Sequence, residues 1–117
     1  MAEAIDGFYA AYLTGAAAYG LAILVLRNGR LVGADVAGTK ISGTFEPAEG
    51  SGNRLRIDIV LQGGGLLIQG VQAPPEGESY SLDFVLPEDF LARPSLRIET
   101  KHGPINARFV RIGDVDA

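Results

Sequence analysis

The sequence contains no cysteine, and His102 is the only histidine among its 117 residues. Without cysteine the chain can form neither a disulfide framework nor a thiolate metal site, which fits a cytoplasmic protein. A single histidine also excludes a metal site that needs several imidazole ligands. Because His102 precedes Gly103 and Pro104, we expect it to lie in a solvated turn. The composition thus predicts that the protein uses no metal or other cofactor.

Motifs for catalysis are missing as well. No serine stands in a G-x-S-x-G nucleophile elbow, and the chain has neither a phosphate-binding loop nor a dinucleotide fingerprint. An enzyme would need an interior carboxylate with a raised pKa, and Asp35 and Asp58 are the candidates. Asp58 falls on the polar face of its predicted strand. We therefore predict that the protein is not an enzyme.

Basic residues are few, since 10 lysines and arginines face 14 acidic residues and the net charge is −4. Without a basic face, we expect no direct contact with nucleic acid. The acids include two pairs in loops rich in proline and glycine, where charge usually keeps a loop solvated. The functional alternative is a docking patch for a basic protein partner, made of Glu46, Glu49, Glu76 and Glu78.

One long charge-free stretch, Phe8 to Leu26, invites a membrane interpretation. Gly15, Gly20 and several small alanines dilute its apolar character, and a translocon prefers denser Leu, Ile and Phe content. The acids that precede it also argue against a signal peptide, which begins with basic residues. We therefore expect no membrane span and read the stretch as β-structure.

The turn at Asn28-Gly29 is the strongest local signal. It separates two apolar runs, and both residues tolerate the positive φ of a type I′ hairpin. The chain also holds 16 glycines without a G-X-Y period. Single glycines in strands mark bends or bulges. Many bends in a short chain favour a sheet that curls into a barrel.

Alternation of apolar and polar residues is clearest from Arg54 to Leu61, which predicts a strand with one buried face. A change of phase near Val110 predicts a bulge. The expected strands cover residues 8–13, 18–26, 30–36, 40–45, 54–61, 66–72, 80–86, 96–101 and 105–112. We predict a single all-β domain over residues 1–117, an eight-stranded antiparallel up-and-down barrel with one short helical turn near Pro87–Leu91.

The first two expected strands are apolar on both faces, which an antiparallel strand tolerates only when both faces are covered. A barrel covers its inner face alone, so the outer face needs another cover. A second copy of the chain is the simplest one, because most oligomers are two-fold homodimers. A shielding loop is the alternative. The expected dimer contacts are Tyr9, Leu13, Ala22, Leu24 and Leu26.

The barrel interior offers a different role. Eight strands enclose a space wide enough for packed side chains or one small ligand. An apolar small molecule or lipid would then lie against one face of two expected strands. The predicted pocket residues are Leu55, Ile57, Ile59, Tyr80, Leu82 and Phe84.

Several sequence blocks together resemble the GrlR-type negative regulators of type III secretion, and they span most of the chain. The matching blocks are Asp6-Gly7-Phe8-Tyr9, the apolar strand from Gly20, Gly29, Gly33-Ala34-Asp35, Gly43 before an aromatic residue, Tyr80-x-Leu82 and Leu86-Pro87-x-x-x-Leu91.

This resemblance implies a small lipocalin-like barrel that forms a homodimer. It also implies inhibition by binding a transcriptional activator, without enzymatic activity. The family pattern includes a surface run of alternating acids, and this sequence contains no such run. The resemblance therefore leaves the identity of the protein partner open.

Overall fold

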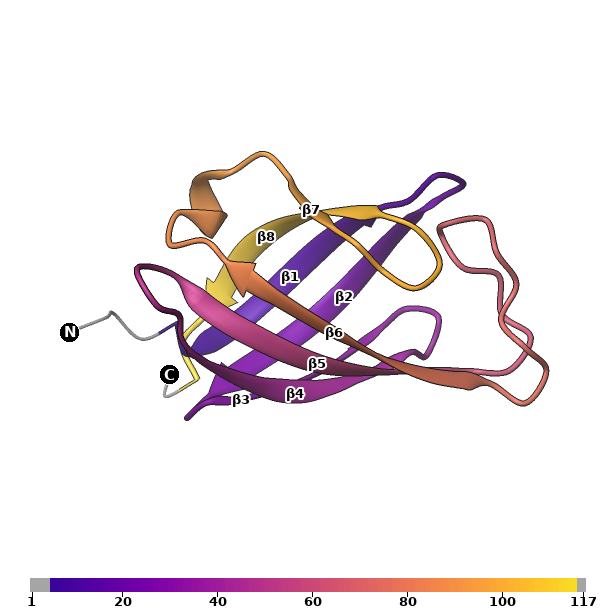
Figure 1. The fold of residues 1–117 in the computed structure, drawn as a ribbon, viewed down its shortest axis with the longest axis horizontal. Helices are drawn as coiled ribbons and strands as arrows, with labels where there is room; N and C mark the ends of the chain where they lie inside the picture. Colours follow the sequence, from indigo (N-terminus) through magenta and orange to yellow (C-terminus); the bar gives the residue numbers. More distant parts are fainter. Residues whose placement is uncertain (1–4, 116–117) are drawn as a thin grey trace.

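The computed structural model describes residues 5–115, which form one antiparallel sheet that curls into a nearly closed barrel (Figure 1). The strand order is β6-β5-β4-β3-β2-β1-β8-β7. The predicted eight-stranded antiparallel barrel is confirmed. The elements are β1 (Gly7–Thr14), β2 (Tyr19–Arg27), β3 (Arg30–Asp35), β4 (Lys40–Pro47), β5 (Asn53–Leu61), β6 (Glu78–Leu86), the 3₁₀ turn η1 (Phe90–Ala92), β7 (Leu96–Ile98) and β8 (Ile105–Gly113).

The hairpin between β2 and β3 has the predicted turn. Asn28 and Gly29 both have positive φ, 52° and 79°, and Arg27 pairs with Arg30 across the turn. The charge-free stretch from Phe8 to Leu26 forms β1 and β2. Within residues 5–115, no helix has the length and apolarity of a membrane span.

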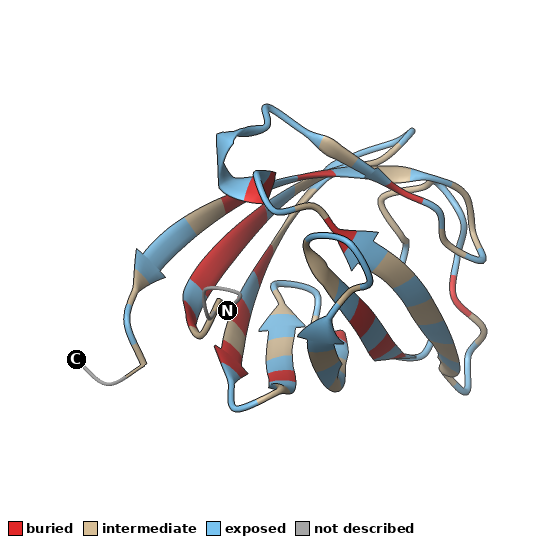
Figure 2. Ribbon diagram, turned by 60° about the vertical axis from the view of Figure 1, so that its left-hand side comes forward, coloured by how far each residue is buried: buried red, intermediate tan, exposed pale blue. Residues whose placement is uncertain are grey.

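Strand β5 shows how alternation positions the core. Every second residue from Leu55 to Leu61 is buried, and the residues between them are exposed, as the banding in Figure 2 shows. The outer face of β5 is polar: Arg56 lies between its cross-strand neighbours Thr44 on β4 and Asp83 on β6. The predicted one-sided strand is confirmed.

One end of the barrel is closed by an aromatic cluster. The Phe90 ring centroid lies 5.8 Å from that of Tyr9 and 5.7 Å from that of Phe109. The helical turn predicted near Pro87–Leu91 is a 3₁₀ turn at Phe90–Ala92, where the Phe90 N–H donates to the Pro87 carbonyl. This turn lies at the barrel end at the left of Figure 1.

The pairing of β1 with β8 joins the C-terminal strands to the rest of the sheet. The register shifts beside Phe8, which pairs with Gly113, while Tyr9 pairs with Arg111. Ile112 is therefore the extra residue of the bulge. The prediction near Val110 was two residues early, because Val110 still pairs regularly with Ala10.

The prediction of a strand at residues 66–72 is wrong. The structure has there only one isolated bridge, between Leu66 and Gln72. The chain turns sharply instead, since Gly70 has a φ of 90° and its N–H donates to the Leu67 carbonyl. Residues 62–77, which we call the 62–77 loop, form an irregular excursion at the right of Figure 1.

Candidate functional site

The barrel contains a cavity of about 160 Å³ near the end opposite the aromatic cluster. All eight strands contribute to its wall, and the 62–77 loop lies at its mouth. Most of the lining side chains are leucine, isoleucine, alanine or phenylalanine. An apolar space of this size accepts a benzene-sized molecule. It is the candidate functional site.

The cavity exists because several inward positions carry small residues. Ala11 and Ala22 face each other across β1 and β2, and Ala107 lies on the neighbouring strand β8. All three are at least 94% buried, so their methyl groups meet protein or cavity rather than solvent. Larger side chains here would fill the space.

The opposite wall carries the larger apolar side chains. It includes all six residues predicted to line a pocket, which are Leu55, Ile57, Ile59, Tyr80, Leu82 and Phe84. Sequence reasoning found them because their strands alternate regularly. It missed the small residues of the facing wall, because alanine stands on both faces of these strands, as Ala10 and Ala11 do, and marks neither as the interior.

The 62–77 loop covers part of the mouth with Leu66, Leu67 and Ile68. It is fastened to the turn between β1 and β2, where the N–H groups of Ala17 and Ala18 both donate to the Ile68 carbonyl at 2.8 and 3.1 Å. The apolar residues that suggested a sixth strand are therefore the cover of the cavity.

Polar groups surround the mouth. They are the side chains of Asp35, Thr39, Gln69, Tyr80 and Thr100. The Asp35 Oδ1 accepts N–H groups of Ala37 and Thr39, both at 2.9 Å, and the Gln69 amide donates to the Thr100 hydroxyl at 3.1 Å. The predicted interior carboxylate at Asp35 thus lies at the mouth, and Asp58 lies on the outer face.

The edge strands β6 and β7 do not pair with each other in the described part of the chain. Side chains bridge the gap near the mouth instead. The carboxylate of Glu78, at the start of β6, accepts a hydrogen bond from the Lys101 ammonium. Its other oxygen lies 2.6 Å from the His102 Nε2. The His102 ring also packs edge-on against Tyr80. We call Glu78, Lys101 and His102 the seam cluster.

Both Glu78 and His102 are largely buried, with side chains 13% and 14% exposed. The hydrogen bond from Lys101, followed by the one from His102, lowers the pKa of Glu78 below its usual value. The expectation of a solvated turn for His102 was wrong, because this side chain packs against Tyr80 and Glu78 instead of facing water.

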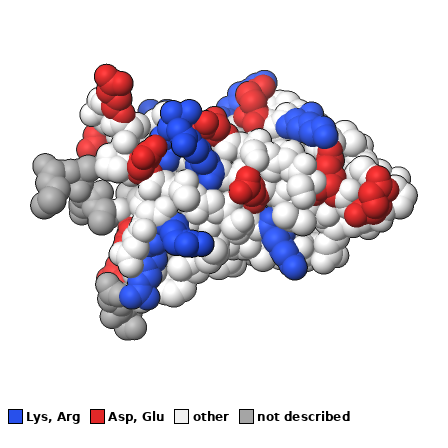
Figure 3. All heavy atoms as spheres, turned by 60° about the horizontal axis from the view of Figure 1, so that its bottom comes forward, with Lys and Arg blue, Asp and Glu red and all other residues white. Residues whose placement is uncertain are grey.

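The four acids predicted as a docking patch do not form one surface. Glu46 lies near the end of β4 and Glu49 in the loop between β4 and β5, whereas Glu76 and Glu78 lie at the other barrel end, beside the start of β6. Glu78 is engaged in the seam cluster. The face drawn in Figure 3 likewise shows acidic and basic side chains interspersed, without an extended patch of one sign.

The five predicted dimer contacts face the wrong side. Tyr9, Ala22, Leu24 and Leu26 are at least 93% buried in the barrel core, and Leu13 packs against that core. The outer face of β1, β2 and β3 carries the alternate residues. They form three cross-strand rows, Phe8–Val25–Val32, Ala10–Ile23–Ala34 and Tyr12–Leu21–Val36, which we call the outer apolar face.

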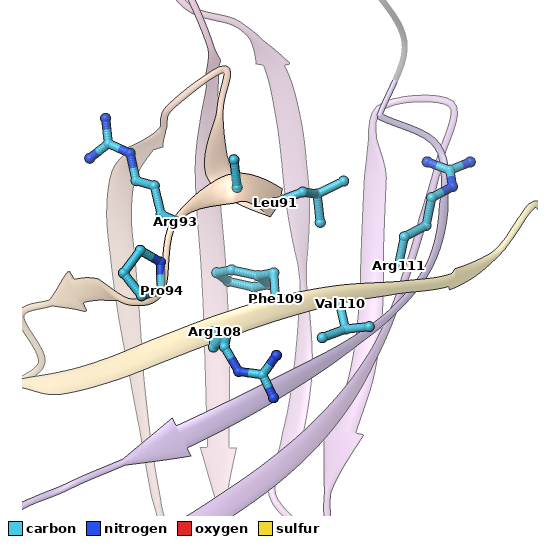
Figure 4. A pocket seen from close by; sticks show the side chains of 8 residues that line it. Leu91, Arg93, Pro94, Arg108, Phe109, Val110 and Arg111 are labelled. Atoms are coloured by element: carbon cyan, nitrogen blue, oxygen red, sulfur yellow. The ribbon is translucent and has the colours of Figure 1, made fainter.

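A second concavity, an open groove of about 400 Å³, lies between η1 and β8 (Figure 4). Three arginines border it, but Arg93 pairs with Asp89 and Arg111 pairs with Asp114. Arg108 instead covers the ring of Tyr12 at 4.8 Å. The groove is therefore a weaker candidate than the interior cavity.

Residues 5–115 contain no group of three or more histidine, aspartate or glutamate side chains that could hold a metal ion. Comparisons of the chain with protein-family models, curated proteins and solved structures find no match.

Proposed function

We propose that this barrel binds a small apolar molecule in its interior cavity. The observation that carries the proposal is the cavity of about 160 Å³, lined by apolar side chains from every strand except β3, which contributes Asp35. A well-packed domain of this size leaves few voids larger than a water molecule. An interior space that opens to solvent is therefore best explained as a ligand-binding site.

The experiment fills the cavity from the wall of small residues. Ala22→Leu adds an isopropyl group at a position that is 98% buried and lines the cavity. Ala34→Leu is the matched control, since Ala34 lies on the next strand but on the exposed outer face. Isothermal calorimetry with benzene measures binding to each protein.

We expect the wild type and Ala34→Leu to bind benzene with the same affinity, and Ala22→Leu to lose at least about tenfold because its new side chain occupies the space. Added bulk in a true cavity is tolerated, whereas overpacking a filled core costs about 1–3 kcal/mol. Benzene binding that is absent from the wild type, or unchanged in Ala22→Leu, would refute the proposal.

The outer apolar face favours a second proposal, that two copies of the chain associate through β1–β3. The strands lie about 4.8 Å apart, and the rise along a strand is about 3.3 Å per residue. The three rows therefore cover roughly 250 Å² of the sheet plane, and the projecting side chains add to this area. The largest apolar patch on a typical monomer measures about 300–600 Å² and is often functional. Ile23 at the centre is 44% exposed, and Val32 in the adjacent row is 50% exposed.

Sedimentation velocity at low micromolar concentration tests this dimer. Ile23→Asp places a charge at the centre of the outer apolar face, and Val60→Asp is the control because Val60 is also 44% exposed but has Lys40 and Ser79 as cross-strand neighbours. We expect dimers for the wild type and Val60→Asp, and monomers for Ile23→Asp. A monomeric wild type contradicts the proposal.

Protein contact is also what the resemblance to the GrlR-type regulators implies. A role as a cytoplasmic, non-enzymatic inhibitor of a transcriptional activator in type III secretion is a further proposal, and its support is the sequence blocks that resemble the family. Co-purification from the source cell tests it, since a transcriptional activator must be recovered with the wild-type protein.

A further inference from the structure

We infer that the cavity selects small amphiphiles with a neutral or cationic polar end and rejects carboxylates of the same size. The inference deepens the proposed binding of an apolar molecule and rests on it. The observation is an apolar interior whose mouth carries one unpaired carboxylate and several hydrogen-bonding groups but no basic side chain.

The apolar part of the ligand is limited by volume. A cavity of about 160 Å³ accepts one benzene-sized ring or a chain of about six carbons. Typical sites for larger ligands measure about 300–1,000 Å³. Sterols and long acyl chains are therefore too large to be enclosed, and a compact apolar end fits.

The polar end of the ligand must lie at the mouth, because the mouth is where the cavity's polar side chains gather. Asp35 and Thr39 lie on the side of β3 and β4, and Tyr80 and Thr100 come from the ends of β6 and β7. These groups supply three hydroxyls, which can donate or accept, and one carboxylate, which accepts. A hydroxyl or amine at the polar end of a ligand finds partners here.

The charge at the mouth is negative. Two backbone N–H groups, from Ala37 and Thr39, fix the Oδ1 of the Asp35 carboxylate. Within residues 5–115, Asp35 makes no ion pair with a lysine, arginine or histidine. The lining of the cavity contains no lysine, arginine or histidine.

The basic side chains around the mouth are directed elsewhere. Lys40 lies on the outer face between Ala34 and Val60. Lys101 and His102 contact Glu78 in the seam cluster, outside the cavity lining. Burial raises the pKa of the Tyr80 hydroxyl, and the charges of Glu78 and Asp35 add to that rise. The Tyr80 hydroxyl is therefore a donor at neutral pH, and it lies in the field of both carboxylates.

A ligand carboxylate at this mouth would face Asp35 without a compensating cation. Two like charges a few ångströms apart in a half-solvated site repel by an energy equivalent to about tenfold or more in affinity. An alcohol can instead donate to the Asp35 carboxylate, and an ammonium group gains Coulomb attraction from it.

The experiment compares hexanol, hexylamine and hexanoate, which share one chain and differ in the polar end. Calorimetry at neutral pH measures each with the wild type, with Asp35→Asn and with Asp58→Asn. The amide of Asp35→Asn retains an oxygen that can accept the N–H groups of Ala37 and Thr39, so the turn is preserved. Asp58→Asn removes the same charge on the outer face, where Asp58 accepts the Ser81 hydroxyl.

We expect the wild type and Asp58→Asn to bind hexanol and hexylamine at least about tenfold tighter than hexanoate. In Asp35→Asn the gap between hexylamine and hexanoate should shrink by about tenfold. Hexanoate binding equal to that of hexanol in the wild type, or a gap that survives in Asp35→Asn, would overturn the inference and leave the cavity function standing. Failure of all three ligands to bind would overturn the cavity function itself.

Discussion

The aromatic cluster at the closed end predicts how much stability Phe90→Ala loses. Phe90 joins the only helical turn among the described residues to the barrel core. Its side chain is 5% exposed, and its ring packs against those of Tyr9 and Phe109. Truncation of a buried phenylalanine to alanine costs about 3–5 kcal/mol. Each aromatic pair contributes about 0.5–1.5 kcal/mol beyond buried area, so the value belongs in the upper part of that range.

Urea denaturation of Phe90→Ala measures the loss as a lower midpoint at an unchanged m-value. Leu91→Ala is the control, since Leu91 is the next residue but is 45% exposed. We expect Leu91→Ala to lose less than about 1 kcal/mol. Phe90→Ala should lose about 4–5 kcal/mol, a large part of the stability of a small domain. A loss below about 1 kcal/mol for Phe90→Ala would refute the closed end as described.

Two further predictions concern the mouth. A Cβ at Gly15 would lie 2.4 Å from the Ile68 carbonyl oxygen. Gly15→Ala should therefore loosen the 62–77 loop and speed hydrogen exchange of the amides bonded to that carbonyl. Gly65→Ala is the control and should leave exchange unchanged, because its Cβ would meet nothing closer than 3.9 Å. The seam cluster lowers the pKa of Glu78, so its stabilisation is present above the unfolded-state pKa of about 4.3 and disappears as pH falls through the lower folded-state pKa. Stability measured between pH 7 and pH 2 should lose part of its acid dependence in Glu78→Gln, and an unchanged profile would contradict the cluster.

Strand β5 and its polar outer face could be predicted because apolar residues dominate one face and polar residues the other. In β5, leucine and isoleucine alternate with arginine and aspartate, so only one register buries the apolar side chains. The β2–β3 turn was equally specific, because Asn28-Gly29 adopts the positive φ values that few other pairs tolerate.

The inward face of β1 and β2 could not be predicted, because both faces are apolar and the alternation carries no phase. The structure turns Ala22 and Leu24 inward and Ile23 outward. The pairing of β1 with β8 settles the phase, since it brings Ala11 opposite the buried Phe109. That contact joins opposite ends of the chain, and no local pattern encodes it.

The separation of the acidic loops could have been predicted. In an up-and-down barrel, successive hairpin loops lie at opposite ends, so the loops that hold Glu49 and Glu76 cannot share a surface. The cover of the cavity was harder to foresee. Leu66 to Ile68 are as apolar as a strand, and only the positive φ of Gly70 shows that the segment turns back.

The most direct test of the interior cavity is nuclear Overhauser spectroscopy of the methyl-labelled protein with benzene. We predict cross-peaks from benzene to the methyl groups of Ala22, Leu24 and Ile57, which line the cavity. Cross-peaks confined to Ile23 and Val32 on the outer apolar face, or none at all, would contradict the account.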